Sequence, residues 1–227
     1  MLDVGCGTGA ITADIAQAVK PEGYVVGVDR DETLLDMART EHAGIENLQF
    51  ERRDATALKF LAQFDIVTSA RALQWIAEPH LAVENMRQAA KCGGVVVILD
   101  YNHTQNKWEP EPPPEFKVCY GAFLAWRQAN GWDNEMADHL PELFRLTGLT
   151  GVRSSAQDEV VKRGDPEFEK LSFLWSGTLR HLAGQLVAAG FCTVSQLEKA
   201  CERYETWART GLVKQTLAMQ ATVGTAP

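Results

Sequence analysis

Strand-length apolar runs alternate with helix-length segments through the first hundred residues of the chain. Each apolar run is short enough to be a strand that is buried on both faces. Strands separated by helices in this way are typical of βαβ units, so the pattern predicts an α/β fold with a parallel sheet. The predicted strands are Met1–Gly5, Tyr24–Asp29, Leu48–Arg53, Phe64–Thr68 and Val95–Leu99, and the predicted helices are Ala10–Val19, a helix capped by Asp31, and His80–Lys91.

The pattern changes after His103, and the chain length of 227 residues corresponds to about 1.5 average domains, which favours one domain, 1–227, with insertions. We expect a core at 1–103, a helical and aromatic insert at 104–149, and closing strands with inserted helices at 150–227. The elements predicted there are an extended loop at Trp108–Phe116, a helix at Val118–Gln128, a helix starting near Pro141, strands at Val152–Val161 and Val213–Val223, one long helical stretch at Pro166–Ala189, and a helix opened by a capping box at Ser195–Glu198.

Charge and composition make several partner classes poor candidates. The chain has 22 Lys and Arg against 30 Asp and Glu, a net charge of −8, so it lacks the positive footprint of a nucleic-acid-binding protein. No apolar run reaches the ~18–20 residues that span a bilayer, so we expect no membrane partner. The five cysteines have no zinc-site spacing and are odd in number. We therefore expect a cytoplasmic protein without a metal site.

A glycine-rich segment, Leu2–Gly9, lies where the first predicted strand meets the first predicted helix. Glycines at alternate positions allow a tight turn and let a ligand approach the backbone. The free N–H groups at the start of the helix suit an anionic group of that ligand. Two classes of ligand use such a turn, and one of them is the dinucleotides, because the spacing Gly5-x-Gly7-x-x-Ala10 satisfies the dinucleotide fingerprint. Asp29 after the second strand suits the ribose hydroxyls of a ligand of either class.

Asp3 distinguishes between these ligands. A carboxylate two residues before the first glycine would repel a pyrophosphate, but it suits a ligand that carries an ammonium group. S-adenosylmethionine (SAM) has both an ammonium and a carboxylate. The motif D-V-G-C-G-T-G, with Asp29 closing the second strand and Asp54-Ala55 closing the third, resembles the class I SAM-dependent methyltransferases over residues 1–103.

This resemblance implies a doubly wound, Rossmann-like α/β fold. Its mostly parallel, seven-stranded sheet would end in an antiparallel β-hairpin, formed by the predicted strands Val152–Val161 and Val213–Val223. The resemblance also implies SAM as the cofactor and a small organic molecule as the methyl acceptor. The implied SAM-binding residues are Asp3, Gly5, Gly7, Gly9, Asp29, Arg30, Asp54, Ala55, Ser69 and Ala70.

Within this set, the resemblance implies that the glycines line the methionyl part of SAM and that Asp3 organises the turn or reaches the ammonium through water. Asp29 would bind the ribose hydroxyls. Asp54 and the backbone N–H of Ala55 would bind the adenine. Ser69 and Ala70 would lie beneath the sulfonium, together with Arg71.

The acceptor site is less defined by the sequence. The segment Arg71–Trp75 resembles that of methyltransferases acting on carboxylates, such as the trans-aconitate and malonyl-carrier enzymes, and also that of quinone C-methyltransferases. Arg71 suits an acceptor carboxylate, because its guanidinium can bind both oxygens. Tyr101 and His103 follow the fifth strand, and His103 is a candidate base. No catalytic residue is assigned beyond these candidates, and the aromatic insert is expected to form a lid.

Two other interpretations of the function of this chain stay open at this point. An NAD(P)-dependent oxidoreductase would leave Asp3 and Asp54 unexplained, and no tyrosine of the chain has a lysine four residues later. A non-catalytic SAM-binding protein is the other reading. The oligomeric state is expected to be a monomer or a homodimer. Because related enzymes place helices before their first strand, we expect a natural start upstream of Met1, and a longer chain that is more stable and binds SAM more tightly.

Overall fold

The computed structural model describes residues 1–227 as two compact units. The first unit comprises residues 1–101, 136–157 and 220–227, and the second comprises residues 102–135 and 158–219. The helix at 136–146, expected within the aromatic insert, belongs to the first unit. The prediction of a single domain stays a prediction.

A seven-stranded sheet forms the centre of the first unit, with the strand order β3-β2-β1-β4-β5-β10-β7. The pairs β1–β2, β2–β3, β1–β4 and β4–β5 are parallel, and β10 pairs with β7 in antiparallel fashion. The predicted fold class, a mostly parallel seven-stranded sheet with a closing antiparallel hairpin, is therefore confirmed. The strands are β1 (Leu2–Val4), β2 (Val25–Asp29), β3 (Leu48–Arg52), β4 (Phe64–Ala70), β5 (Ala90–Tyr101), β7 (Thr150–Ala156) and β10 (Met219–Thr225).

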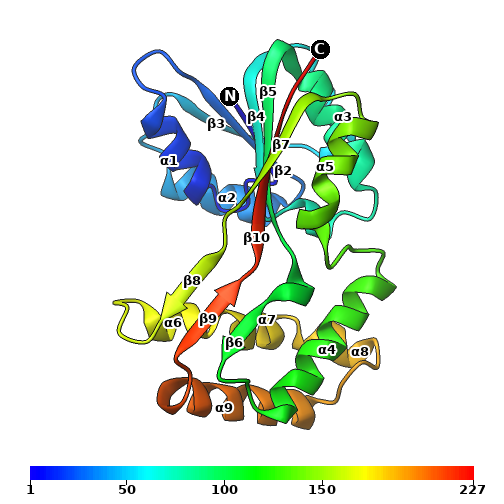
Figure 1. The fold of residues 1–227 in the computed structure, drawn as a ribbon. Helices are drawn as coiled ribbons and strands as arrows, with labels where there is room; N and C mark the ends of the chain where they lie inside the picture. The colour runs from blue at the N-terminus through cyan, green and yellow to red at the C-terminus, as the bar shows by residue number, and fades with distance from the viewer. The chain divides into compact units, whose positions relative to one another are not determined.

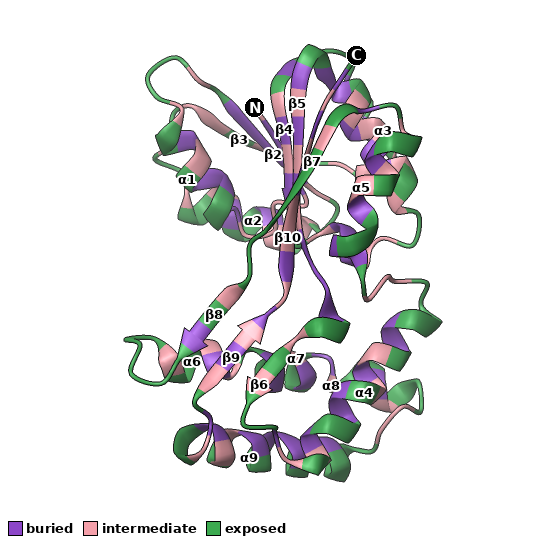
Figure 2. Cartoon of the chain, in the orientation of Figure 1, coloured by how far each residue is buried: buried purple, intermediate pink, exposed green.

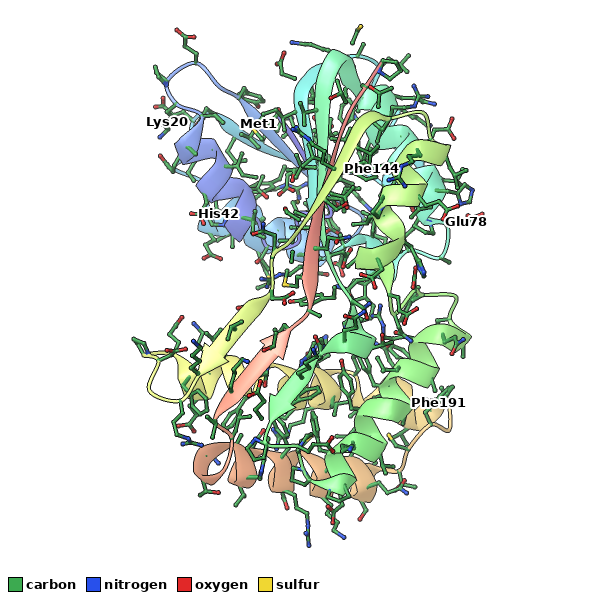
Figure 3. The ribbon with its side chains drawn as sticks, viewed as in Figure 1. Met1, Lys20, His42, Glu78, Phe144 and Phe191 are labelled. Carbon is green, nitrogen blue, oxygen red and sulfur yellow. The ribbon has the colours of Figure 1, made fainter.

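Helices cover both faces of this sheet, as the apolar character of its strands requires. Figure 1 shows α1 (Ala10–Ala18) and α2 (Glu32–Glu41) on one face, and α3 (Pro79–Ala89) and α5 (Met136–Leu146) on the other. The residues of β1 and β2 are buried along almost all of their length, and buried residues alternate with less buried ones through most of β4 and β5 (Figure 2). Phe144 of α5, labelled in Figure 3, is fully buried in the same core. Short 3-10 turns lie at η1 (Ala55–Ala57), η2 (Leu73–Trp75) and, in the second unit, η3 (His103–Gln105).

The second unit has a three-stranded antiparallel sheet with the order β6-β9-β8 and five helices. Its core is rich in aromatic side chains, and the rings of Phe116 and Tyr204 stack with their centroids 3.9 Å apart. Its elements are β6 (Lys107–Glu109), α4 (Pro114–Ala129), β8 (Glu159–Lys162), α6 (Phe168–Ser172), α7 (Leu174–His181), α8 (Ala183–Ala188), α9 (Val194–Thr210) and β9 (Lys214–Leu217).

Two strand predictions were wrong in the same way. The predicted strand Val152–Val161 is divided into β7 and β8, and the predicted strand Val213–Val223 is divided into β9 and β10. The two halves of each segment belong to different sheets. Both segments change sheets at the same place, where the Asp158 carboxylate accepts a hydrogen bond of 3.1 Å from the Met219 N–H. An apolar pattern indicates a strand but does not reveal which sheet the strand joins.

Helix boundaries also differ from the predictions. The stretch Pro166–Ala189 is three short helices, because Phe173 and Leu182 leave helical geometry between them, with ψ near 5° and 3°. The capping box of α9 consists of Thr193 and Gln196, two positions earlier than the predicted pair of Ser195 and Glu198. Pro141 lies inside α5, which starts five residues earlier than expected, at Met136. The predicted loop Trp108–Phe116 contains the end of β6 and the start of α4.

Candidate cofactor site

The glycine turn follows β1 at the carboxyl edge of the sheet, and hydrogen bonds attach it to β2. The backbone N–H groups of Gly5 and Cys6 both donate to the Val28 carbonyl, at 2.8 and 3.0 Å. The Gly7 N–H donates to Oδ2 of Asp29, at 2.9 Å. Oδ1 of Asp29 accepts from the N–H of Asp31, the residue that caps α2, at 3.0 Å. The Asp29 carboxylate therefore holds the turn and the start of α2 in a fixed relation.

The turn glycines differ in what surrounds them. Gly5, Gly7 and Gly9 all have positive φ, at 75°, 55° and 80°, which side-chain-bearing residues rarely adopt. A Cβ on Gly5 would lie 2.4 Å from the Cβ of Ala72, so Gly5 is required for packing. A Cβ on Gly7 would have no atom within 4 Å. Gly7 therefore borders open space into which a ligand can approach the backbone, so this turn fits the methionyl group that the sequence implied.

Asp3 lies buried beneath the turn, with 3% of its surface exposed. Oδ2 of Asp3 accepts a hydrogen bond of 2.6 Å from Oγ1 of Thr12 on the first turn of α1. Burial raises the pKa of Asp3 to about 6, the Thr12 hydrogen bond opposes this shift, and the charge of Asp29 adds to it. Because burial disfavours the carboxylate, a nearby cationic ligand group would stabilise it. Thr12 was not predicted, although its position three residues after Gly9 could have identified it.

Asp54 and Ala55 form the start of η1, at the end of β3. Oδ1 of Asp54 accepts from the Thr56 N–H at 2.8 Å and from the Thr56 hydroxyl at 2.7 Å, and these bonds lower the pKa of Asp54. The charge of Arg30 contributes to the same shift. The Arg30 carbonyl accepts a hydrogen bond of 3.2 Å from Nε of Arg52, the last residue of β3. The structure thus brings these three predicted residues together at the ends of β2 and β3.

Ser69 and Ala70 are at the end of β4, as predicted. Ser69 is buried, and its hydroxyl donates to the Val4 carbonyl at 2.7 Å. The Ser69 side chain therefore ties β4 to β1 directly behind the glycine turn. Its contribution to the site is to hold the two strands at this edge.

Arg71 follows β4 in a strained conformation, with φ at 60°. Its N–H donates to the Leu99 carbonyl at 2.8 Å, and its carbonyl accepts from Nε2 of Gln74 at 3.2 Å. Its guanidinium lies 5.6 Å from the ring centroid of Tyr101, the last residue of β5, in a cation–π arrangement. Strained residues that their surroundings hold in place are concentrated at functional sites. The structure thus brings together Arg71 and Tyr101, two of the three predicted acceptor-site candidates.

Asp100 is a residue of this edge that the sequence analysis missed. It is fully buried, Oδ2 accepts from the Gln74 N–H at 3.1 Å, and Oδ1 accepts from the Tyr101 N–H at 2.9 Å. The carboxylate therefore connects the end of β5 to the turn after β4. An acidic residue directly after the apolar run Val95–Leu99 was the available signal.

His103, the third candidate, belongs to the second unit and is only 2% exposed. Its ring meets the rings of Phe123 and Trp175 edge-on, with centroids 6.0 and 5.2 Å away. Burial, and then the charge of Arg127, hold the pKa of His103 well below its usual range. The imidazole is therefore uncharged at neutral pH.

Two further observations concern the chain as a whole. No group of three or more His, Cys, Asp and Glu side chains is arranged to hold a metal ion. None of the helices combines the length and the apolar character that crossing a bilayer requires.

The raised pKa of Asp3 predicts a pH dependence of stability. Because the pKa of Asp3 is higher in the folded protein than its ordinary value of 3.8, this group stabilises the fold fully below about pH 4 and loses that contribution as pH rises through about 6. Asp3→Asn keeps an acceptor for Thr12 but cannot ionise. We expect its free energy of unfolding, relative to the natural chain, to rise by up to about 3 kcal/mol between pH 4 and 7. Urea denaturation across this range measures the difference, and a flat difference would contradict the prediction.

The strain at Arg71 predicts the order of stability of two variants. Arg71→Gly and Arg71→Ala both lose the guanidinium, and they differ in the cost of a positive φ. We expect the Gly variant to be more stable than the Ala variant by about 1 kcal/mol, the reverse of the order at an ordinary position. Thermal and urea denaturation of the pair test this, and an Ala variant that is equally or more stable would show that the turn is not strained.

Comparisons with known proteins agree with this geometry. The model of the family described as "Methyltransferase domain" matches residues 1–137. Demethylmenaquinone methyltransferase from Staphylococcus aureus is 37% identical over 171 residues, which cover 67% of this chain and 68% of the relative.

Solved structures of low sequence identity share the fold. Phosphoethanolamine N-methyltransferase 2 from Haemonchus contortus matches with a TM-score of 0.62 at 18% identity, over 100% of this chain and 49% of its own. The chain thus spans about half the length of that protein. The YcgJ protein from Bacillus subtilis matches with a TM-score of 0.61 at 16% identity, over 99% of this chain and 90% of its own. Since the family model covers more than half of the residues, the resemblance found in the sequence is confirmed: the chain belongs to the class I SAM-dependent methyltransferases.

Proposed function

We propose that this chain transfers a methyl group from SAM to a small organic acceptor, with the cofactor bound at the turn Gly5–Gly9. One observation carries the assignment of the site. Asp29 accepts a hydrogen bond from the N–H of Gly7, and the same residue borders open space. A carboxylate suited to ribose hydroxyls is thus held against the turn that leads into the first residues of α1, and N–H groups at the start of a helix suit a carboxylate.

Different residues of the first unit would bind different parts of the cofactor. The turn and the start of α1 would bind its carboxylate end, and Asp29 its ribose. Asp54 and Ala55, with Arg30 nearby, would bind the adenine, and the buried charge of Asp3 would complement the ammonium. Bound SAM supplies a methyl group on a positively charged sulfur. The protein must then align the acceptor with that methyl and exclude water, which alone supplies about 7–11 kcal/mol of barrier reduction in well-aligned reactions.

The proposed acceptor is an aromatic molecule with an oxygen substituent, such as a quinol or a phenol. The 37% identity with demethylmenaquinone methyltransferase favours this class and favours methylation at carbon. Arg71 beside the Tyr101 ring offers a cationic and aromatic surface that suits a phenolate oxygen. A carboxylate acceptor is the second candidate, because a guanidinium also binds that group well.

Calorimetry with S-adenosylhomocysteine and with NAD tests the cofactor site. We expect S-adenosylhomocysteine to bind and NAD not to bind. Asp29→Asn should weaken S-adenosylhomocysteine at least tenfold, because hydrogen bonds to a charged group contribute about 1.5–3 kcal/mol. Asp31→Asn is the matched control, since asparagine caps a helix as well as aspartate does, and should change affinity less than twofold. Equal losses in both variants, or tighter binding of NAD, would refute the assignment. Transfer of tritiated methyl to a quinol tests catalysis separately.

The two turn glycines predict opposite phenotypes. Gly7→Ala places a methyl group in open space, so it should cost only about 1–2 kcal/mol of stability from positive φ while reducing S-adenosylhomocysteine affinity at least tenfold. Gly5→Ala adds a collision with Ala72 to the same strain, so it should cost clearly more stability. Urea denaturation and calorimetry of both variants measure the contrast. If Gly7→Ala bound the ligand normally, the proposed position of the cofactor would be wrong.

A further inference from the structure

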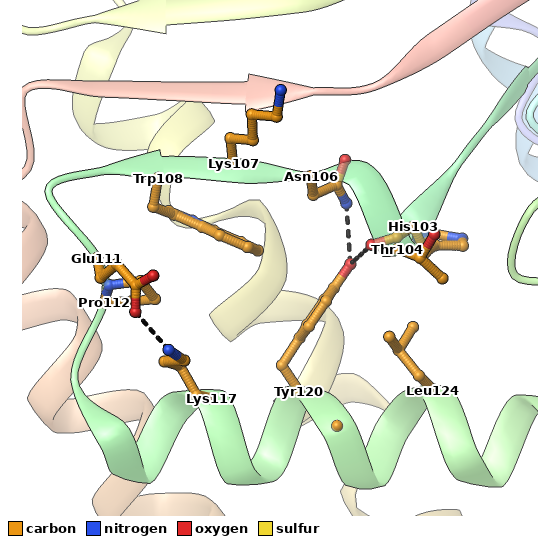
Figure 4. Close-up of a pocket in the computed structure, with 11 residues that line it drawn as sticks. His103, Thr104, Asn106, Lys107, Trp108, Glu111, Pro112, Lys117, Tyr120 and Leu124 are labelled. Atoms are coloured by element: carbon orange, nitrogen blue, oxygen red, sulfur yellow. Dashed lines mark hydrogen bonds and ion pairs between the residues drawn. The ribbon is translucent and has the colours of Figure 1, made fainter.

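The second unit contains a cavity of about 350 Å³ between β6 and the first half of α4 (Figure 4). Its lining includes Trp108, Pro112, Lys117, Tyr120, Gly121 and Leu124. None of its lining residues belongs to the glycine turn or to any other part of the first unit. The volume is at the lower end of the range of about 300–1,000 Å³ that small-molecule sites occupy.

Two aromatic rings form fixed walls of this cavity. The rings of Trp108 and Tyr120 meet at 79° with their centroids 5.4 Å apart. The Trp108 indole N–H donates to the Tyr204 hydroxyl at 2.9 Å. The Tyr120 hydroxyl accepts from Nδ2 of Asn106 at 2.8 Å and donates to the His103 carbonyl at 3.1 Å. Hydrogen bonds within the protein thus hold the polar ends of both rings, and what these side chains offer a ligand is ring surface.

Gly121 leaves part of the helix wall open. It lies in the interior of α4, where glycine is less favourable than alanine by about 1 kcal/mol. A Cβ at this position would have no atom within 4 Å, so packing does not require the missing side chain. Since Gly121 lines the cavity, any larger residue there would project into or across its opening.

The charges at the rim balance each other. The Lys117 ammonium forms an ion pair with the Glu111 carboxylate, and Figure 4 shows the two side chains together at one end of the cavity. The Lys107 side chain extends from β6 away from Tyr120 in the same view. The rim therefore does not favour an ion of either sign, but the ion pair offers one donor and one acceptor to a neutral hydroxyl.

We propose that this cavity is a second ligand site, which binds an uncharged aromatic ring carrying a hydroxyl group. The ring packs against Trp108 and Tyr120, and the hydroxyl meets the pair of Lys117 and Glu111 at the rim. Offset or edge-to-face packing against aromatic walls contributes about 0.5–1.5 kcal/mol beyond burial of the area. This site is independent of the proposed methyl transfer, because the lining residues that bind the ring take no part in holding SAM.

Calorimetric titration with 1-naphthol tests the site through two matched substitutions. Gly121→Leu fills the cavity, whereas Gly177→Leu changes another helical glycine with open space around it, in α7 and outside the cavity lining. We expect saturable binding to the natural chain, at least a tenfold loss of affinity at this one site in Gly121→Leu, and less than a twofold change in Gly177→Leu. Gly121→Ala, which favours the helix, should show an intermediate loss with a raised melting temperature.

Two further probes test the proposed ligand chemistry. 1-Naphthoate carries a charge and cyclohexanol lacks an aromatic ring, so both should bind at least tenfold more weakly than 1-naphthol. Absence of 1-naphthol binding, equal effects of the two leucine variants, or equally tight binding of 1-naphthoate would overturn the proposal. Titration of each variant with S-adenosylhomocysteine should give the affinity of the natural chain, which separates failure at this cavity from failure at the glycine turn.

Discussion

The Asp29 carboxylate is the interaction on which the candidate site depends. It accepts one N–H from the turn after β1 and one from the cap of α2, so a single side chain at the end of β2 joins three elements. Because β2, β1 and β4 are parallel neighbours, their carboxyl ends lie together at one edge of the sheet. Ser69 and Asp100 extend the same arrangement to β4 and β5. At the edge of the sheet where we propose that the cofactor binds, short polar side chains thus connect the ends of neighbouring strands by hydrogen bonds.

Much of this edge could be predicted from the sequence because its signals are local. Asp3, the turn glycines and Asp29 are each recognisable from their position at a strand end. The α/β alternation likewise gave the correct fold class, since a strand buried on both faces has a distinctive apolar run. The strained conformation of Arg71 was not visible, because it results from contacts with Leu99 and Gln74 rather than from any local preference of arginine.

The features that could not be predicted from the sequence depend on contacts between segments that are distant in the chain. The division of Val152–Val161 and Val213–Val223 between two sheets is fixed by which strands they meet, and no periodicity encodes that choice. The cavity beside Gly121 arises only when β6 lies across α4, with Trp108 anchored to Tyr204, 96 residues away in the chain. The helical breaks at Phe173 and Leu182 likewise follow packing within the second unit, where the apolar pattern alone favoured one continuous helix.

The position of the last two strands has a consequence for the order of folding during synthesis. β9 is the middle strand of the second sheet, and β10 lies between β5 and β7 in the first. Neither sheet is continuous until residues 214–225 have been made, because each would otherwise have a gap at an interior position. Lys107 of β6 must wait for Thr216, its partner in β9. Both sheets therefore expose unpaired edges while the chain emerges from the ribosome, and the final segment closes the two together.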